Sequence, residues 1–421
     1  MNFEVLYSAA HAEFPDTEPL GGGKAVADYL IREWQNRQPF PLTVLSPKSL
    51  GLPLPESLAQ LSELQYARFC REFERAATAE ILKRNPQSCV VLSNDISEGP
   101  DFRMLGQRGY RVVTIFHVDV VEYFTRFYLR GWIRPETAAR FRWFGVMPDL
   151  LRLVFEKQLH CVQHSARFVV PSAPMKEKIL RCYPFCPPEK IVVLPWGNVA
   201  APTSTVAAVG ACPDLPRFLH RGSGIGDRRA SIPQSDSALT ERRSSIRDDE
   251  IVIITLSRLS PEKGIERLLA ALPRVNTHAK TVRVFICGGA AYMKGRAYER
   301  KLRRLARTIN TARVEFTGHI IGQQKAALLQ RADIFVSPSR HESYGLTIAE
   351  ALAAGCRVVS HNHYGAEGEV VDCANPEALA ATLSAMIASG RTRKSELGKS
   401  VPSHAAQQLS EILTGLATAD S

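Results

Sequence analysis

Two glutamates bracket the start of a predicted helix in the segment SPSRHESYGLTIAEALAAGCRVVS, where a strand is expected to end at Pro338. Free backbone N–H groups at the start of that helix favour a phosphate or another anion, and a glycine there lets a ligand approach the backbone closely. Glu350 could then accept hydrogen bonds from ribose hydroxyls. The alternative is an ordinary strand-loop-helix connection in which Glu342 is only a helix-start charge. The residues expected around this helix start are Ser343, Tyr344, Gly345 and Leu346.

A basic pair follows another predicted strand, in the segment TLSRLSPEKGIERLLAAL. Arg258 offers a planar fork of donors and Lys263 a mobile point charge, and both suit a diphosphate that gains negative charge as a bond to it breaks. A solvated basic pair at a helix start is the alternative interpretation.

Spaced motifs in a fixed order carry a resemblance to a known family. They are S-R-L-x-x-x-K-G, a Gly-Gly strand end, F-x-G-H-I, A-D-I-F-V-x-P-S and E-x-x-x-x-x-x-x-E. Together they resemble the retaining GT-B glycosyltransferases of family 4, densely from Ile251 to Ser360 and more weakly from Met1 to Asn198.

The resemblance implies roles for individual residues. Arg258 and Lys263 would bind the donor diphosphate, Glu350 would hold the nucleotide ribose, and Glu342 would sit beside the transferred sugar. The loop Ser343, Tyr344, Gly345 and Leu346 would present its amides to the donor's phosphate and sugar. A glycine loop before a helix would approach the donor phosphates from the first half of the chain, although three glycines could also form only a flexible turn; it comprises Gly21, Gly22 and Gly23.

A histidine in VVTIFHVDVVEYF follows a predicted strand at the place where the family carries an active-site histidine. By that resemblance His117 would contact the transferred sugar, and Asp119 would orient it or bind the acceptor. Without the match, a lone histidine is usually a surface or structural residue.

The same resemblance implies transfer with retention of configuration through an oxocarbenium-like transition state, from a UDP- or GDP-sugar. Catalysis would rest on orientation and on stabilising the departing diphosphate. No D-x-D signature is present, and two cations can neutralise a diphosphate as a divalent ion would. We therefore expect no required metal or cofactor.

Short apolar, β-branched runs alternate with amphipathic stretches in both halves, which predicts two Rossmann-like α/β domains whose parallel sheets face across a cleft. We expect strands at Phe3–Tyr7, Leu42–Leu45, Cys89–Leu92, Val112–Phe116, Phe168–Val170, Ile191–Leu194, Ile251–Leu256, Val282–Cys287, Val314–Phe316, Ile334–Val336 and Arg357–Ser360. The predicted divisions are an acceptor-side domain (1–199), a low-complexity linker (200–249), a nucleotide-sugar domain (250–390) and a helical tail (391–421).

The composition limits the partners and the compartment. The formal charge of +11 suggests an anionic partner. The charge alone does not distinguish a nucleotide, a phosphorylated acceptor, a membrane and nucleic acid. No zinc motif or aromatic-basic repeat supports specific nucleic-acid binding. The nine cysteines show no C-x-x-C pair, and neither a signal peptide nor a membrane span is apparent, so we expect a cytoplasmic protein with reduced thiols.

One stretch, 127–159, mixes arginines with aromatic residues and could lie on anionic lipid at the inner face of the membrane, although a helix packed in the first domain would look the same. The stretch after Ser360 is shorter than the family usually shows, which leaves a non-catalytic nucleotide-sugar binding or scaffold protein as the alternative function. A dinucleotide-dependent oxidoreductase is disfavoured because no G-x-G-x-x-G follows the first strand.

Overall fold

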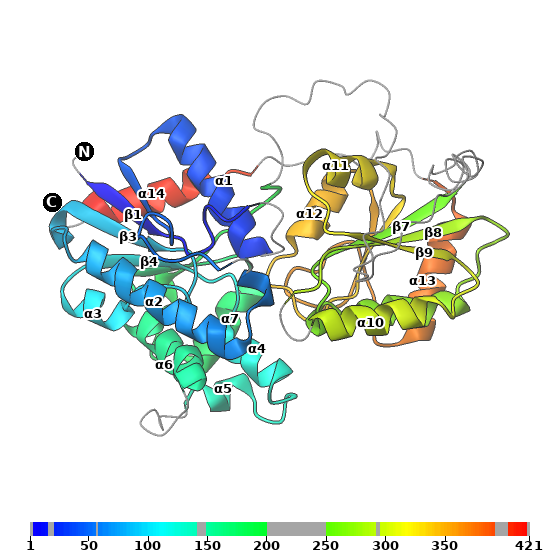
Figure 1. Cartoon of the computed structure of the whole chain (residues 1–421), viewed down its shortest axis with the longest axis horizontal. Coiled ribbons are helices and arrows are strands. Elements are labelled where there is room, and N and C mark those ends of the chain that lie inside the picture. The colour runs from blue at the N-terminus through cyan, green and yellow to red at the C-terminus, as the bar shows by residue number, and fades with distance from the viewer. Residues whose placement is uncertain are drawn as a thin grey trace, which may run out of the picture.

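The computed structural model describes residues 3–15, 21–55, 58–140, 149–199, 250–291, 295–391 and 403–418, with backbone alone at 149 and 150. The predicted linker Ala200–Asp249 lies outside the described residues, as does most of the stretch between the second domain and the last helix. Figure 1 shows two lobes side by side, each built on its own sheet.

The first lobe contains a six-stranded, all-parallel sheet with the order β2-β1-β3-β4-β5-β6. The chain runs to one side of β1 to form β2 and then returns to add β3 to β6 on the other side. The strands are β1 (Glu4–Ser8), β2 (Leu42–Leu45), β3 (Cys89–Ser93), β4 (Arg111–Ile115), β5 (Arg167–Val170) and β6 (Ile191–Val193). The helices between them are α1 (Gly22–Arg37), α2 (Glu63–Ile81), α3 (Phe102–Gln107), α4 (Val120–Phe127), α5 (Pro135–Ala138), α6 (Asp149–His164) and α7 (Ala173–Cys182).

The second lobe repeats this arrangement with the order β12-β11-β10-β7-β8-β9, again all parallel. Here the reversal of strand order lies between β7 and β10. The strands are β7 (Ile251–Leu256), β8 (Val282–Cys287), β9 (Arg313–Gly318), β10 (Ile334–Ser337), β11 (Arg357–Ser360) and β12 (Glu369–Val370). The helices are α9 (Ile265–Ala271), α10 (Gly295–Ala306), α11 (Gly322–Arg331), α12 (Leu346–Ala353) and α13 (Pro376–Ala388).

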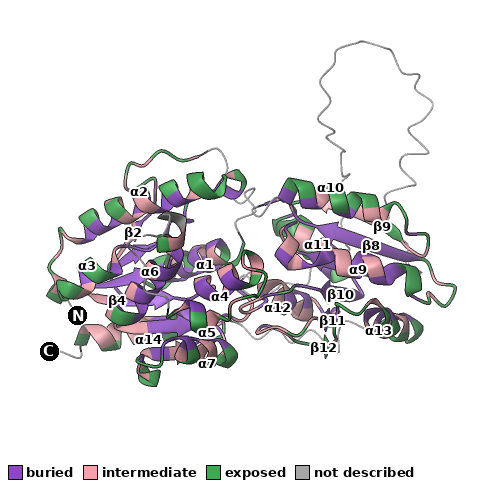
Figure 2. Cartoon of the chain, turned by 90° about the horizontal axis from the view of Figure 1, so that it is seen from below, coloured by how far each residue is buried: buried purple, intermediate pink, exposed green. Residues whose placement is uncertain are grey.

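Both sheets are covered on both faces, which explains why their strands are almost continuously apolar (Figure 2). In the first lobe α1 packs on one face, while α3, α6 and α7 pack on the other. In the second lobe α9, α10 and α13 cover one face, and α11 and α12 cover the opposite face. Alternate residues of each strand enter the two cores, as Ile253 and Ile254 of β7 illustrate.

The last helix, α14 (Ala405–Thr418), crosses back to the first lobe and packs beside α1 (Figure 1). Leu409 and Leu413 are fully buried in the first-lobe core. The indole Nε1 of Trp34 donates to Ser410 Oγ at 2.8 Å, and the hydroxyl of Tyr29 donates to the Ser403 carbonyl at 3.0 Å. The first lobe is therefore built from both ends of the described chain.

The structure confirms the predicted fold class, and the eleven predicted strands are present within two residues of the expected bounds. The short strand β12 was not predicted, because two exposed residues carry no recognisable apolar pattern. Helix starts follow local capping rules: Ser62 and Gln65 form a capping box at α2, and Asp119 accepts from the Glu122 amide at α4. The eight described cysteines are buried free thiols.

Candidate active site between the two sheets

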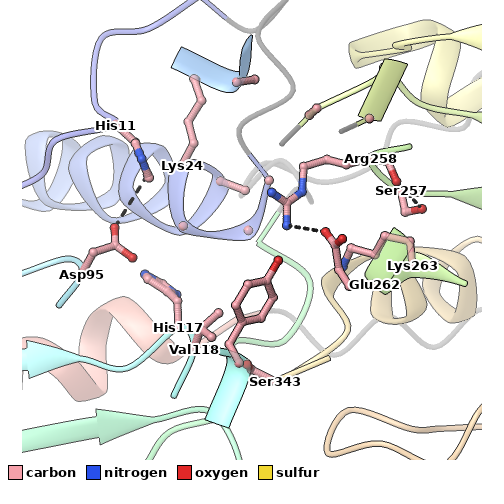
Figure 3. Close-up of a pocket in the computed structure, with 18 of the residues that line it drawn as sticks. His11, Lys24, Asp95, His117, Val118, Ser257, Arg258, Glu262, Lys263 and Ser343 are labelled. Atoms are coloured by element: carbon pink, nitrogen blue, oxygen red, sulfur yellow. Dashed lines mark hydrogen bonds and ion pairs between the residues drawn. The ribbon is translucent and has the colours of Figure 1, made fainter. Parts of the chain in front are cut away.

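A cleft of about 1260 Å³ lies between the lobes, at the carboxyl ends of both sheets. Parallel α/β sheets bind ligands at this edge, and best where the strand order reverses. The cleft exceeds the roughly 300–1,000 Å³ typical of a single small-molecule site, so it has room for two substrates. Figure 3 shows part of its lining, with His11, Asp95 and His117 on one side and Arg258 and Lys263 on the other.

The predicted basic pair lies in this cleft, beyond the end of β7. The Nζ of Lys263 lies 2.7 Å from Glu342 Oε1, and Arg258 Nη2 lies 3.6 Å from Glu262 Oε1. Gly264 directly after Lys263 has a left-handed φ of +59°, and a Cβ there would lie 2.5 Å from the Pro338 carbonyl oxygen. The lysine is therefore held against the strand end that carries Glu342.

Charge neutralisation keeps Glu342 ionised in this partly buried position. Burial alone would raise its pKa, but Lys263 and His363, with a hydrogen bond from Ser339, lower the pKa of Glu342 to about 2. His363 was not predicted from the sequence, and burial lowers its pKa to about 4. The carboxylate thus stays charged at neutral pH beside the lysine.

The predicted anion-binding loop also lies in the cleft, at the start of α12. Gly345 caps this helix with φ +84°, and Ser343, Tyr344 and Leu346 line the cleft with it. The Tyr344 hydroxyl accepts a hydrogen bond from the Gly197 amide of the first lobe at 2.7 Å. This loop therefore joins the two lobes as well as presenting the free amides of a helix N-terminus.

Glu350 lines the cleft one turn into α12, but it has a partner that sequence reasoning missed. Lys325 Nζ lies 2.8 Å from Glu350 Oε1, whereas Glu350 Oε2 has no hydrogen-bond partner among the described residues. One carboxylate oxygen is thus available for a ligand hydroxyl. Lys325 had no sequence signal, since it lies in an ordinary amphipathic helix.

The glycine loop of the first lobe reaches across to the second-lobe residues. A Cβ on Gly21 would lie 3.4 Å from Arg258 Nε, and one on Gly22 would lie 3.3 Å from Leu346 Cδ1. A Cβ on Gly23 would instead lie 3.5 Å from both carboxylate oxygens of Asp95. The three glycines therefore let α1 begin in the narrowest part of the cleft.

His117 lines the first-lobe side of the cleft after β4. Its Nε2 lies 3.4 Å from Asn94 Oδ1, and its ring lies 5.9 Å from that of the buried Trp196. Burial lowers the pKa of His117, so the neutral imidazole is the form present near pH 7. A neutral ring in this position can exchange hydrogen bonds with a bound sugar.

Asp119 does not line the cleft, in contrast to the other predicted site residues. It is completely buried, caps α4, and accepts a hydrogen bond from Gln158 Nε2 at 3.0 Å. The structure thus gives Asp119 a place in the first-lobe interior, where it caps α4 and is not part of the cleft lining.

Side chains of Tyr364 and His341, on either side of α12 in the sequence, also join the lobes. The Tyr364 hydroxyl donates to Glu122 Oε1 at 2.9 Å, and Glu122 is fully buried. The ring of His341 lies between those of Tyr123 and Phe127 in the first lobe and Tyr364 in the second. Sequence reasoning missed these contacts because they join positions more than 200 residues apart.

This packing of His341 predicts acid sensitivity. Burial lowers the pKa of His341 to about 3, below the ordinary histidine value near 6.5, so the unfolded chain binds a proton before the folded protein does. Stability contributed by the neutral ring is complete above pH 6.5 and is lost as the pH falls toward 3. We expect a loss of about 2 kcal/mol in the free energy of unfolding between pH 7.5 and 5, measured by urea titration. In His341→Phe, this loss in the free energy of unfolding should be smaller by about 2 kcal/mol. The control His404→Phe changes an exposed residue and should lose as much as the unaltered protein. An equal loss in all three proteins would refute the prediction.

Within the described ranges, no three His, Cys, Asp or Glu side chains are grouped so that they could hold a metal ion. None of the helices in the described part of the chain is long and apolar enough to cross a bilayer. The basic, aromatic stretch 127–159 is described except for 141–148.

Comparisons with known proteins agree with this geometry. Residues 237–398 match the family described as Glycosyl transferases group 1. The chain is 31% identical over 136 residues to the alpha-monoglucosyldiacylglycerol synthase of Streptococcus pneumoniae. This alignment covers 32% of this chain and 30% of that protein. It is 32% identical over 160 residues to the GDP-mannose-dependent monoacylated alpha-(1-6)-phosphatidylinositol monomannoside mannosyltransferase of Corynebacterium glutamicum, covering 36% of this chain and 40% of that one. The alignments thus span less than half the length of these relatives.

The fold extends further than the sequence similarity. The solved structure of Anabaena Alr3699/HepE in complex with UDP and glucose superposes with a TM-score of 0.56 at 15% identity, covering 98% of this chain and 95% of that one. This superposition confirms the predicted GT-B fold over nearly the whole chain.

Proposed function

Because residues 237–398 match the glycosyl transferases group 1 family, we propose that this chain transfers a hexosyl unit from a nucleoside diphosphate sugar to a hydroxyl group of an acceptor. Transfer proceeds with retention at the anomeric carbon. Because the alignments with the relatives cover only part of their length, the activity of the whole protein rests on the cleft as well as on the family.

The observation that carries this proposal is the meeting of cations, helix start and glycine loop at one point of the cleft. Arg258 packs against Gly21 of the facing lobe, and Lys263 lies against Glu342 next to the start of α12. A pyrophosphate bound between Arg258 and Lys263 would receive two cations and the free amides at the start of α12. The glycines leave the space that a phosphate group needs.

Each residue has a role in the proposed reaction. Arg258 and Lys263 stabilise the negative charge that develops on the leaving diphosphate, and Glu350 Oε2 accepts a hydrogen bond from the ribose. Glu342 and His117 hold the transferred sugar from opposite sides of the cleft. The proton of the acceptor hydroxyl passes to the leaving phosphate oxygen as the new glycosidic bond forms on the same face. Arg258 and Lys263 supply the neutralisation that a divalent ion provides elsewhere, so the reaction needs no metal.

The donor is a UDP- or GDP-sugar. A GDP-mannose-dependent relative and a structural neighbour that binds UDP support this class. Thermal shift and turnover should be measured across UDP- and GDP-linked hexoses with excess EDTA present. Stabilisation by one donor, with release of its nucleotide, is the expected result. Binding without any turnover would favour the non-catalytic binding protein, and neither binding nor turnover would refute the proposal.

Peripheral contact with anionic membranes is a separate proposal, which the residues after α4 support. Trp132 is 88% exposed, and the neighbouring Arg130 and Arg134 are also exposed. An exposed aromatic ring flanked by arginines suits a lipid headgroup layer. Co-sedimentation with phosphatidylglycerol vesicles at low salt tests it, and equal recovery with and without vesicles would reject it.

A further inference from the structure

The first-lobe wall of the cleft contains a polar cluster to which the proposed donor site assigns no role. It consists of His11, which follows β1, and of Asp95 and Glu98, which follow β3. These two strands are neighbours, and the strand order of the first sheet reverses between them. The carboxyl edge at such a reversal is where an open α/β sheet binds its ligand.

His11 lies between the two carboxylates of this cluster. The residue is 7% exposed, lines the cleft, and has no hydrogen-bond partner for either ring nitrogen among the described residues. Its Nδ1 lies 3.7 Å from Asp95 Oδ2 and its Nε2 lies 3.4 Å from Glu98 Oε1, and the His11–Asp95 approach is drawn in Figure 3. Burial opposes protonation of His11, but Glu98 and Asp95 raise the pKa of its ring, so the ring is paired with two carboxylates that also line the cleft.

The two walls of the cleft differ in charge. Among the described residues that line it, the second lobe contributes five cationic side chains against the three carboxylates of Glu262, Glu342 and Glu350. The first lobe contributes four carboxylates and one lysine. The second-lobe cations are Arg258, Lys263, Arg296, Arg300 and Lys325. The first-lobe charges are Lys24, Asp28, Glu63, Asp95 and Glu98.

This segregation selects the charge of the second substrate. Lys24 forms an ion pair with Asp28, and His11 lies beside Asp95 and Glu98, so the four carboxylates of this wall outnumber its cations. A carboxylate accepts strong hydrogen bonds from hydroxyl groups but repels phosphate. The anionic substrate therefore belongs on the second-lobe wall, and a neutral polyol fits the first-lobe wall.

An apolar surface continues outward from this cluster. Tyr66 of α2, Phe124 of α4 and Leu153 of α6 line the same cavity. Tyr128 also lines the cavity, stacks on Phe124 with ring centroids 5.1 Å apart, and is 43% exposed. A hydroxylated head group seated near Asp95 could thus extend an alkyl or aryl substituent along this surface toward solvent.

We propose that the acceptor is an uncharged glycoside with an apolar aglycone, whose sugar hydroxyls bind His11, Asp95 and Glu98 and whose aglycone lies along Tyr66, Phe124 and Tyr128. This inference rests on the proposed function and names the acceptor class for the same cleft. Two kinds of molecule combine a neutral sugar with an apolar aglycone: a soluble alkyl or aryl glycoside and a neutral membrane glycolipid.

The test compares acceptors with the donor that the thermal-shift panel identifies. Octyl glucoside, galactoside and mannoside below their micellar concentrations are compared with the matching methyl glycosides and sugar 6-phosphates. We expect at least one octyl glycoside to be glycosylated, with kcat/KM about tenfold or more above its methyl counterpart and above the 6-phosphate. Preference for a phosphorylated sugar would overturn the inference.

Failure of the inference differs from failure of the proposed function. If the donor binds and is slowly hydrolysed but no neutral glycoside is glycosylated, in solution or as a neutral glycolipid in phosphatidylcholine vesicles, the acceptor class is wrong and the donor function stands. If no donor binds, the proposed function itself fails. Turnover of the soluble glycoside or of the vesicle glycolipid supports the inference and identifies the source.

Variants locate the two parts of the site. Asp95→Asn should raise the acceptor KM about tenfold or more, because a hydrogen bond to a charged group is lost, and should change the donor KM and donor hydrolysis much less. Tyr128→Ser should reduce the preference for octyl over methyl glycoside, whereas Trp132→Ser, at an 88% exposed ring outside the cavity lining, should not. Equal changes for every acceptor and for the donor would show that these side chains only support the fold and would refute the assignment.

Discussion

Replacing Lys263 by methionine is expected to lower kcat/KM for the nucleotide sugar by about 10²–10³-fold, since one charged donor to the developing phosphate charge is lost. The lysine is 12% exposed at its side chain and contacts Glu342 at 2.7 Å, so it has a fixed position in the cleft. Steady-state nucleotide release at saturating acceptor measures the effect. A variant with kcat/KM within about twofold of the unaltered protein would remove Lys263 from the reaction.

Two further variants separate chemistry from folding. Lys263→Met leaves the partly buried Glu342 carboxylate without its main partner, which is expected to destabilise the protein. Adding Glu342→Gln removes that charge and should restore the melting temperature without restoring activity. Lys178→Met provides the matched control, because Lys178 forms a comparable pair with Glu136 at 2.9 Å outside the cleft lining. Its activity should be unchanged.

Replacing Gly365 by alanine is expected to abolish measurable donor binding and to destabilise the protein by about 3 kcal/mol or more, because backbone atoms cannot yield as a flexible side chain can. A Cβ at this position would lie 1.9 Å from the Tyr344 carbonyl oxygen and 2.7 Å from the Gly345 nitrogen. The loop after β11 would therefore be pushed away from the start of α12. Isothermal titration with UDP and GDP, together with urea unfolding, measures both effects.

Gly415→Ala is the control for this variant. Gly415 lies inside α14, and a Cβ there meets no atom within 4 Å. Alanine should stabilise the helix by up to about 1 kcal/mol and leave nucleotide binding unchanged. Normal nucleotide affinity in Gly365→Ala would show that the nucleotide still binds when the loop after β11 is pushed away from the start of α12. That result would contradict the expected role of this contact.

The strands and the second-lobe site could be predicted because their signals are local. A buried parallel strand such as β7 is apolar at every position, and Arg258, Lys263 and Glu350 lie at fixed distances from predicted strand ends or helix starts. The order of these segments along the chain then identified the fold. Their roles in binding and reaction remain predictions that the variants above test.

The polar cluster of the first lobe could not be predicted because its members share no spacing, unlike His117 and the glycine loop. His11, Asp95 and Glu98 come together only through the pairing of β1 with β3. The same holds for the contacts between the lobes: nothing in the sequence around Glu122 indicates Tyr364 as its partner. Asp119 illustrates the converse case, because this carboxylate near a candidate histidine caps α4 and is outside the cleft lining.

The return of α14 to the first lobe affects how the protein acquires its structure during synthesis. Domains usually form in order as they leave the ribosome, the N-terminal one first. Here the cavity that Leu409 and Leu413 fill, beside Trp34, stays open until almost the whole chain has emerged. The nascent first lobe would expose that apolar surface while the second lobe is being made, which makes it a natural substrate for chaperones at that stage.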